Sequence, residues 1–204
     1  MGSRFNSLEL AAFDPSRALQ SARSDVLDLY ELPPCGRLLL DVGADERASR
    51  NSIEAAFGLV LPGEPNTVMV GEPLVAWLGP GRFMLLCAID QAGGLMERVS
   101  TLVSEYGGLC LDISAAKVAL RVCGTAAEDC LAGLVAIDLR RSSLGIGACA
   151  QTKLLQAGAL ILRTPDGSGF DLHVDRSFAA YTWRALLTAG GEFGLRPPLQ
   201  GIPA

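Results

Sequence analysis

Apolar and polar residues follow two different periods along this chain, and their succession predicts a mixed α+β protein. Between residues 94 and 106, apolar side chains recur every three or four positions, the period of one face of an α-helix. Other segments are short, apolar and bounded by Gly and Pro, as strands are. In the first half we predict helices over 47–57 and 94–106 and strands over 37–42, 67–70, 74–78, 82–89 and 109–113.

The second half repeats this order of elements. Residues 117–123 are predicted to form a strand, with Val118, Leu120 and Val122 on one face and Lys117 and Arg121 on the other. Thr125 and Glu128 have the spacing of a capping box, so a helix is expected to begin at Thr125. Further strands are predicted over 148–155, 159–163 and 170–174, and a final helix over 177–189.

Each half therefore runs strand, helix, several strands and a second helix. We predict an α+β fold of two ferredoxin-like halves sharing one core, with antiparallel sheets and helices on one side. Pro15 and the pair at 33–34 mark a polar N-terminal region that contains a short helix over 15–22 and can become ordered against a partner. The expected organisation is an extended N-terminal arm over 1–34, a first α+β half over 35–113, a second over 114–195 and a C-terminal tail over 196–204.

The last predicted helix is apolar around almost its whole circumference. One stripe contains Phe178 and Tyr181, and another contains Trp183 and Leu187. Such a helix must be buried on more than one side, and in a chain this short we expect the second side to be a neighbouring subunit. Composition agrees, because 50% of the residues are hydrophobic and only 19% are charged, against roughly 25% charged in typical soluble domains.

Neither a membrane nor a nucleic acid is an expected partner. The longest strongly apolar run, 83–89, is far shorter than the roughly 18 residues of a membrane-spanning helix. A net charge of −5 with scattered Lys and Arg argues against binding a phosphate backbone. Arg4 is the only early positive charge and no apolar segment follows it, so we expect no signal peptide and a cytoplasmic location. The six cysteines never form a C-x-x-C pair and are expected to be reduced and buried.

Candidate chemistry is sparse. The single histidine, His173, is expected on a solvent-facing side or at a sheet edge, and it has no companions at metal-ligand spacing. The segment 144–147 carries a G-x-G but lacks the third glycine and the strand-to-helix context of a dinucleotide fingerprint. We predict no catalytic, cofactor-binding or metal-binding residue in this chain. The densest polar set is expected to be a structural network: Asp112, Ser114, Lys117 and Arg121.

Several short motifs occur in an order that resembles one known family. Gly58-Leu-Val-Leu-Pro62 precedes Trp77-Leu-Gly-Pro80 and a hydrophobic strand. The second half contributes Leu111-Asp-Ile-Ser114, Val118-Ala-Leu-Arg-Val-Cys-Gly124, Ile137-Asp-Leu139, Gly147-Ala-Cys-Ala-Gln-Thr152 and Arg176-Ser-Phe-Ala-Ala-Tyr-Thr-Trp183. Their order and spacing over residues 36–194 resemble the gamma subunits of heterotetrameric sarcosine oxidases.

This resemblance implies a fold related to the folate-binding aminomethyltransferases and a structural, non-catalytic role. It implies alpha, beta and delta partner subunits that carry FAD, FMN, NAD, tetrahydrofolate and zinc. The complex would oxidatively demethylate sarcosine and pass the one-carbon unit to tetrahydrofolate. In aminomethyltransferases a Gly-rich hairpin is followed by paired aspartates that meet the folate and the substrate amine. Here the corresponding stretch, 156–161, contains no acid that could neutralise a cationic amine.

Three alternatives stay open from the sequence. The chain could be the equivalent subunit of a related N-methyl amino acid or N-methylglutamate dehydrogenase, whose substrate pocket would lie on another subunit. It could also be a stand-alone folate-dependent methyltransferase, which the missing acids disfavour. A solitary folate-fold binding protein is the last alternative, and the apolar final helix counts against it.

Overall fold

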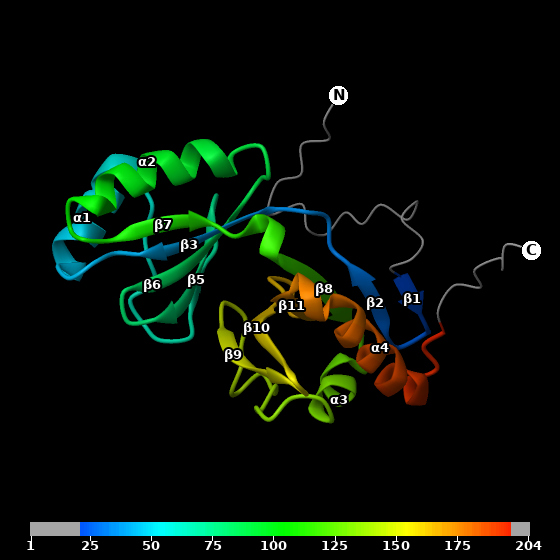
Figure 1. Ribbon diagram of the computed structural model, residues 1–204. Coiled ribbons are helices and arrows are strands. Elements are labelled where there is room, and N and C mark those ends of the chain that lie inside the picture. The colour runs from blue at the N-terminus through cyan, green and yellow to red at the C-terminus, as the bar shows by residue number, and fades with distance from the viewer. Residues whose placement is uncertain (1–20, 197–204) are drawn as a thin grey trace, which may run out of the picture. The chain divides into compact units, whose positions relative to one another are not determined.

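In the computed structural model (Figure 1), which describes residues 21–196, the chain forms two units, each built on its own sheet. The first unit contains Pro34–Lys117 and Gly147–Ala150. Within the described range, the second unit contains residues 21–33, 118–146 and 151–196.

The first unit has a five-stranded sheet in the order β4-β5-β6-β3-β7. All the pairings within it are antiparallel, and β3 lies between β6 and β7. The strands are β3 (Gly36–Asp41), β4 (Val68–Met69), β5 (Leu74–Gly79), β6 (Arg82–Cys87) and β7 (Leu109–Asp112).

Two helices, α1 (Glu46–Phe57) and α2 (Ala92–Ser104), cover one face of this sheet (Figure 1). The Asp45 carboxylate accepts a hydrogen bond from the Ala48 amide at the start of α1, and Gly58 ends the helix in the left-handed conformation that glycine adopts without strain. The period-two positions of β3 and the 3.6-period positions of α2 meet in one apolar core: Leu38, Leu40, Ile53, Phe83, Leu85, Val99 and Val103.

The second unit has a six-stranded sheet in the order β1-β2-β8-β11-β10-β9. Its strands are β1 (Ser21–Arg23), β2 (Asp28–Glu31), β8 (Lys117–Cys123), β9 (Cys149–Leu154), β10 (Ala157–Arg163) and β11 (Gly169–Asp175). The helices α3 (Ala127–Ala132) and α4 (Ala179–Gly190) pack against each other, and α3 also contacts β11. Short 3-10 turns occur at Ser114–Ala116, Arg176–Phe178 and Gly191–Phe193.

Gly169 shows why β11 lies so close to β8. A Cβ atom at this position would collide with the Val122 carbonyl and with the Cys123 side chain. Only glycine lets the two backbones approach to this distance, and β11 is thereby held as a central strand.

The predicted α+β class, with antiparallel sheets and helices packed on them, is confirmed. The helix predicted to begin at Thr125 begins instead at Ala127, its N-cap residue is Ala126, and no side chain caps it. The capping-box prediction was therefore wrong. Glu128, which that prediction assigned to the cap, pairs with Arg163 of β10, because a buried guanidinium competes for its carboxylate.

The predicted N-terminal arm differs from the structure where it can be compared. Residues 21–31 supply β1 and β2, and β2 pairs with β8. Ala22, Leu27 and Leu29 are buried there, so this segment belongs to a sheet. Both strands are too short to show a clear period in the sequence. Residues 1–20 and 197–204, and with them most of the predicted helix over 15–22 and nearly all of the tail, lie outside the described residues.

Candidate functional site

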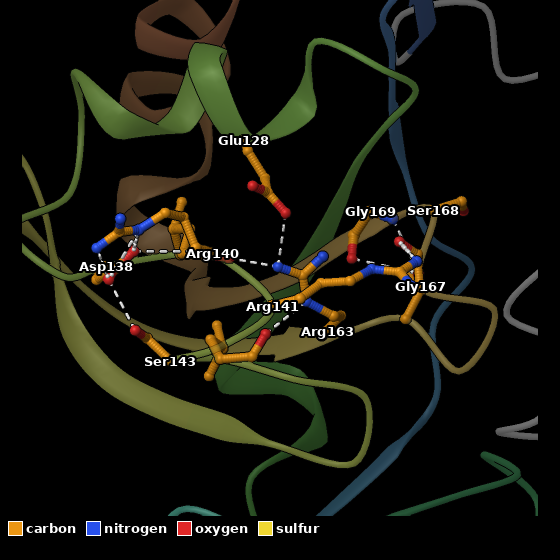
Figure 2. A network of polar contacts seen from close by, with 12 residues as sticks. Glu128, Asp138, Arg140, Arg141, Ser143, Arg163, Gly167, Ser168 and Gly169 are labelled. Atoms are coloured by element: carbon orange, nitrogen blue, oxygen red, sulfur yellow. Dashed lines mark hydrogen bonds and ion pairs between the residues drawn. The ribbon is translucent and has the colours of Figure 1, made fainter.

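Arg163, the last residue of β10, is the centre of a buried polar network in the second unit (Figure 2). Its side chain is 2% exposed. The guanidinium donates hydrogen bonds to the carbonyl oxygens of Leu139 and, at 2.5 Å, of Leu144. It also pairs with the Glu128 carboxylate at 2.8 Å and lies 4.5 Å from the centre of the Phe170 ring.

These contacts show what Arg163 does. Its donors satisfy backbone carbonyl groups of the irregular segment that follows α3. The arginine thus ties the segment to the sheet, and these contacts are structural.

A second cluster, on the exposed surface of the same segment, involves Asp138, Arg140 and Ser143 (Figure 2). The Arg140 guanidinium forms a two-pronged contact with the Asp138 carboxylate, at 2.9 and 2.7 Å. Hydrogen bonds from Arg140 and Ser143 hold the pKa of the Asp138 carboxyl well below its ordinary value. The Asp138 carboxylate therefore stabilises the loop that contains Arg140 and Ser143.

Asp166 closes the loop between β10 and β11. It accepts hydrogen bonds from the Thr164 hydroxyl at 2.6 Å and from the Ser168 amide at 3.0 Å. These bonds lower the pKa of Asp166 from 3.8 to about 2. Because the folded-state pKa is the lower one, the ionised carboxylate stabilises the fold above about pH 4, and this contribution disappears as the pH falls through about 2.

We expect Asp166→Asn to remove part of the acid-dependent loss of stability between pH 4 and pH 2. The effect should be small, because Asp166 is solvent-exposed and screened. Urea unfolding midpoints measured at several pH values would check this, with the exposed Glu64→Gln as control. An unchanged acid limb in the Asp166 variant would contradict the assignment.

The second buried ion pair joins Arg121 of β8 to Asp171 of β11. The two side chains form a bidentate contact at 2.6 and 2.8 Å. The contact with Asp171 raises the pKa of Arg121, which stays charged, whereas burial raises the pKa of Asp171 and the guanidinium opposes that shift. Tyr30 lies close by, with its hydroxyl 3.6 Å from the Cys123 sulfur, and burial raises the pKa of this phenol to about 12.

The polar set predicted from the sequence is only partly brought together. Ser114 accepts a hydrogen bond from the Arg37 amide at 2.8 Å and donates one to Asp112 at 2.5 Å. The buried Arg37 guanidinium donates to carbonyls of Cys35 and Lys117. Arg121 does not join this set, because its guanidinium is held by Asp171.

The prediction for His173 was wrong. It is 1% exposed, and it lies neither at an edge nor on a solvent-facing side. The reason is its strand: β11 lies between β8 and β10, and all but its last residue are buried. The alternation of side chains along one strand places His173 on one face, but it cannot reveal that both faces of that strand are covered.

The prediction that the cysteines are buried is confirmed for all but Cys123, which is half-buried. All six cysteines are free, and five of them are buried. Burial raises the pKa of Cys87 to about 12 and that of Cys149 to about 11. These thiols remain protonated at neutral pH and are poor nucleophiles.

The sequence missed Arg37, Asp171 and Arg163 as partners in buried networks. The only signal was a charged residue at the end of, or within, an otherwise apolar strand, such as Arg163 after Leu160-Ile-Leu162. That pattern marks a residue that needs a buried partner, but it does not identify the partner.

The β9–β10 hairpin is the place where the family resemblance would put acids. Its turn contains Leu155, with a φ of 52°, and Gln156, and Lys153 lies just before it. Lysine, leucine and glutamine supply no carboxylate to bind an amine or accept a proton, so these residues do not fit the amine-binding role. Among residues 21–196, no group of three or more His, Cys, Asp or Glu is placed to hold a metal ion.

Described residues of single units line several hollows, of which two have largely apolar walls or an aromatic contact. One, of about 450 Å³, lies in the first unit beside Phe57, Pro73 and Leu95, with Arg98 stacked 4.9 Å over the Phe57 ring. The other, of about 290 Å³, lies in the second unit between α4 and the strands β2 and β8. No helix within residues 21–196 is both long and apolar enough to span a membrane.

Comparison with known proteins shows the broad class of protein to which the chain belongs. The family model of the GCVT N-terminal domain matches residues 54–201. A solved aminomethyltransferase of the glycine cleavage system from Bartonella henselae has the same fold, with a TM-score of 0.61 at 13% identity over 85% of this chain and 55% of that chain. The protein is thus of the GCVT N-terminal domain class.

A narrower likeness follows within that class. Sarcosine oxidase subunit gamma from Corynebacterium sp. (strain P-1) is 31% identical over 148 residues, which is 72% of this chain and 71% of that one. The chain belongs to the sarcosine oxidase gamma subunit family. A chain of the heterotetrameric sarcosine oxidase from Corynebacterium sp. U-96 shares the fold, with a TM-score of 0.76 at 24% identity over 92% of both chains.

Proposed function

We propose that this chain is the structural gamma subunit of a heterotetrameric sarcosine oxidase and performs no chemistry itself. The observation that carries the proposal is the β9–β10 hairpin. The aminomethyltransferase-like fold is kept, but the hairpin presents Lys153 and Gln156 instead of carboxylates. The fold is therefore retained without the groups that would bind a cationic amine or accept its proton.

The buried ionic groups support the same proposal. Arg37, Arg121 and Arg163 are each engaged with backbone carbonyls or a carboxylate of their own unit. Catalytic groups need room for a substrate within hydrogen-bond reach, and these guanidinium groups are covered on all sides. Their geometry is that of groups that hold a fold together.

In this proposal the other subunits of the complex carry out the oxidation and the one-carbon transfer. We assign FAD, FMN, NAD, tetrahydrofolate and zinc to the alpha, beta and delta subunits and expect the assembly in the cytoplasm. The complex would oxidatively demethylate sarcosine and transfer the one-carbon unit to tetrahydrofolate. An equivalent complex acting on another N-methyl amino acid would use this chain in the same way.

Co-expression with candidate partner chains, followed by pull-down on this chain, tests the proposal. We expect a yellow complex with larger chains that oxidises sarcosine. A colourless, monodisperse chain that captures no partner would overturn it. Calorimetric titration of the isolated chain with tetrahydrofolate separates the methyltransferase alternative, because tight binding would indicate a folate site of its own.

The outer face of α4 gives a prediction for assembly. Phe178 and Tyr181 are 38% and 39% exposed, and their rings meet edge to face at 6.3 Å. Replacing both with serine should lower the stability of the isolated chain by less than about 1 kcal/mol, since surface positions contribute little. We expect the same change to reduce recovery of the complex strongly, because exposed aromatic residues are typical interface anchors.

The matched control is Val70→Ser, which removes an exposed apolar side chain from the first unit. It should leave both folding and complex recovery unchanged. Equal loss of folding and recovery in the aromatic double variant would show that these rings serve the chain's own core.

A further inference from the structure

Strand β7 is the last strand at one end of the five-stranded sheet, next to β3. The Ile113 amide donates a hydrogen bond to the Arg37 carbonyl, and this bond fixes the phase of the β3–β7 ladder. Because hydrogen bonding alternates along an antiparallel ladder, Cys110 and Asp112 direct their backbone N–H and C=O groups away from β3. Within residues 21–196, no other residue is hydrogen-bonded to these outward groups.

The opposite end of the same sheet is covered by backbone. There the Val68 amide donates to the Gly147 carbonyl and the Cys149 amide to the Asn66 carbonyl, both at 2.8 Å. Strand β7 has no such cover within the described range, and it also lacks the lysine, proline or bulge that usually protects an edge strand. An edge of this kind is a template for pairing with a strand of another chain.

The side chains of β7 add an apolar surface to this free edge. Cys110 packs into the core beneath α1 and α2, so Leu109 and Leu111 project from the other face of the sheet. These two leucines are 43% and 50% exposed. Unpaired backbone groups and exposed leucines thus occur on one short strand, as they do on strands that are covered in an assembly.

The sequence of β7 is complementary to itself in an antiparallel pair. Two registers bring outward groups together, with the two-fold axis at Cys110 in one and at Leu111 in the other. The register centred on Cys110 places each Leu109 directly opposite Leu111 of the second copy. It also sets Asp112 opposite Gly108, whereas the register centred on Leu111 would make the two Asp112 carboxylates diagonal neighbours. Charge and apolar contact therefore both favour the register centred on Cys110.

We propose that two copies of this chain pair antiparallel through β7, with the two-fold axis at Cys110, and join their five-stranded sheets into one continuous sheet. Leu109 and Leu111 of both copies then form one apolar strip on the face away from α1 and α2. This pairing goes beyond the proposed role in an oxidase and does not rest on it. Failure of the oxidase complex to form would leave the pairing standing, and failure of the pairing would leave the subunit role untouched.

Sedimentation velocity of the full-length chain at several concentrations tests the pairing. We expect a reversible dimer that is populated at about 100 µM, since a single short strand makes a small interface. Leu111→Lys should raise the dissociation constant at least about tenfold, because it places a charge in the apolar strip. The matched control is Ile89→Lys, which changes an exposed apolar side chain of the same unit outside β7 and should leave the constant unchanged. Urea unfolding midpoints verify that both variants fold.

Cysteine cross-linking tests the register. A mixture of Leu109→Cys and Leu111→Cys chains should form a disulfide between the two variants on mild oxidation, because the two positions face each other as a non-hydrogen-bonded pair. Neither variant should cross-link with itself. The wild-type chain gives the background, since its own cysteines are buried or half-buried.

Several outcomes would overturn the proposal. A wild-type chain that stays monomeric at every concentration would show that the edge does not pair with itself. Equal weakening of the dimer by Leu111→Lys and Ile89→Lys would place the contact elsewhere. Cross-linking of Leu111→Cys with itself would show the other register. A monomeric chain whose Leu111→Lys variant no longer captures larger partner chains would assign the edge to another subunit.

Discussion

Replacing Arg163 with methionine is expected to lower the free energy of unfolding by about 3–5 kcal/mol, because methionine fills the space and leaves the buried carbonyls of Leu139 and Leu144 without donors. The ion pair with Glu128 and the contact with the Phe170 ring are lost as well. Urea unfolding followed by circular dichroism would measure the change.

A substitution of Arg140, which lies in the same segment after α3, is the control for this prediction. Arg140→Met removes a guanidinium that pairs with the Asp138 carboxylate on the exposed surface, where ion pairs contribute little. Its unfolding midpoint should be that of the wild-type protein. Equal effects of the two substitutions would show that the buried network does not hold the segment.

Breaking the Arg121–Asp171 pair from one side is expected to cost about 3–5 kcal/mol, since the remaining charge stays buried without its partner. Either Arg121→Met or Asp171→Leu should show this loss. The double variant should be more stable than the sum of the single effects predicts, because no buried charge is left.

A double-mutant cycle measures this coupling. We expect the two substitutions to interact by at least about 1.5 kcal/mol, as contacting residues in a buried network do. Additive effects would show that each side chain is stabilised independently of the other. The Tyr30 hydroxyl is a useful reporter, because burial raises its pKa to about 12 and the nearby Arg121 lowers it. Opening of the site to water would lower the pKa toward 10, whereas loss of the Arg121 charge from a closed site would raise it.

The order of helices and strands was predictable because it depends on local patterns. The apolar positions of residues 94–106 predicted α2, which the structure places at Ala92–Ser104. Strand β8 was predicted with its observed limits, Lys117–Cys123, because Val118, Leu120 and Val122 recur at every second position. Both signals come from neighbouring residues, so no knowledge of the fold was needed.

Burial of polar side chains was not predictable in this way. His173 was expected at a surface because its neighbours in sequence are apolar, but β11 is a central strand whose residues are buried on both faces. Likewise, β2 pairs with β8, a strand nearly one hundred positions away, and β1 pairs with β2. A short segment with weak periodicity shows none of this, and it was assigned to an extended arm.

The sequence by itself determined the α+β plan, the resemblance to the gamma subunits and the lack of acids over residues 156–161. These depend on local periodicity and on residue identity, which can be read without coordinates. Only the tertiary structure decided which charged residues become partners. Arg163 meets groups 19 to 35 positions away, and Arg121 meets Asp171 across 50 positions. Such contacts form where strand order brings distant segments together, and a buried charge is tolerated only when that order supplies its partner.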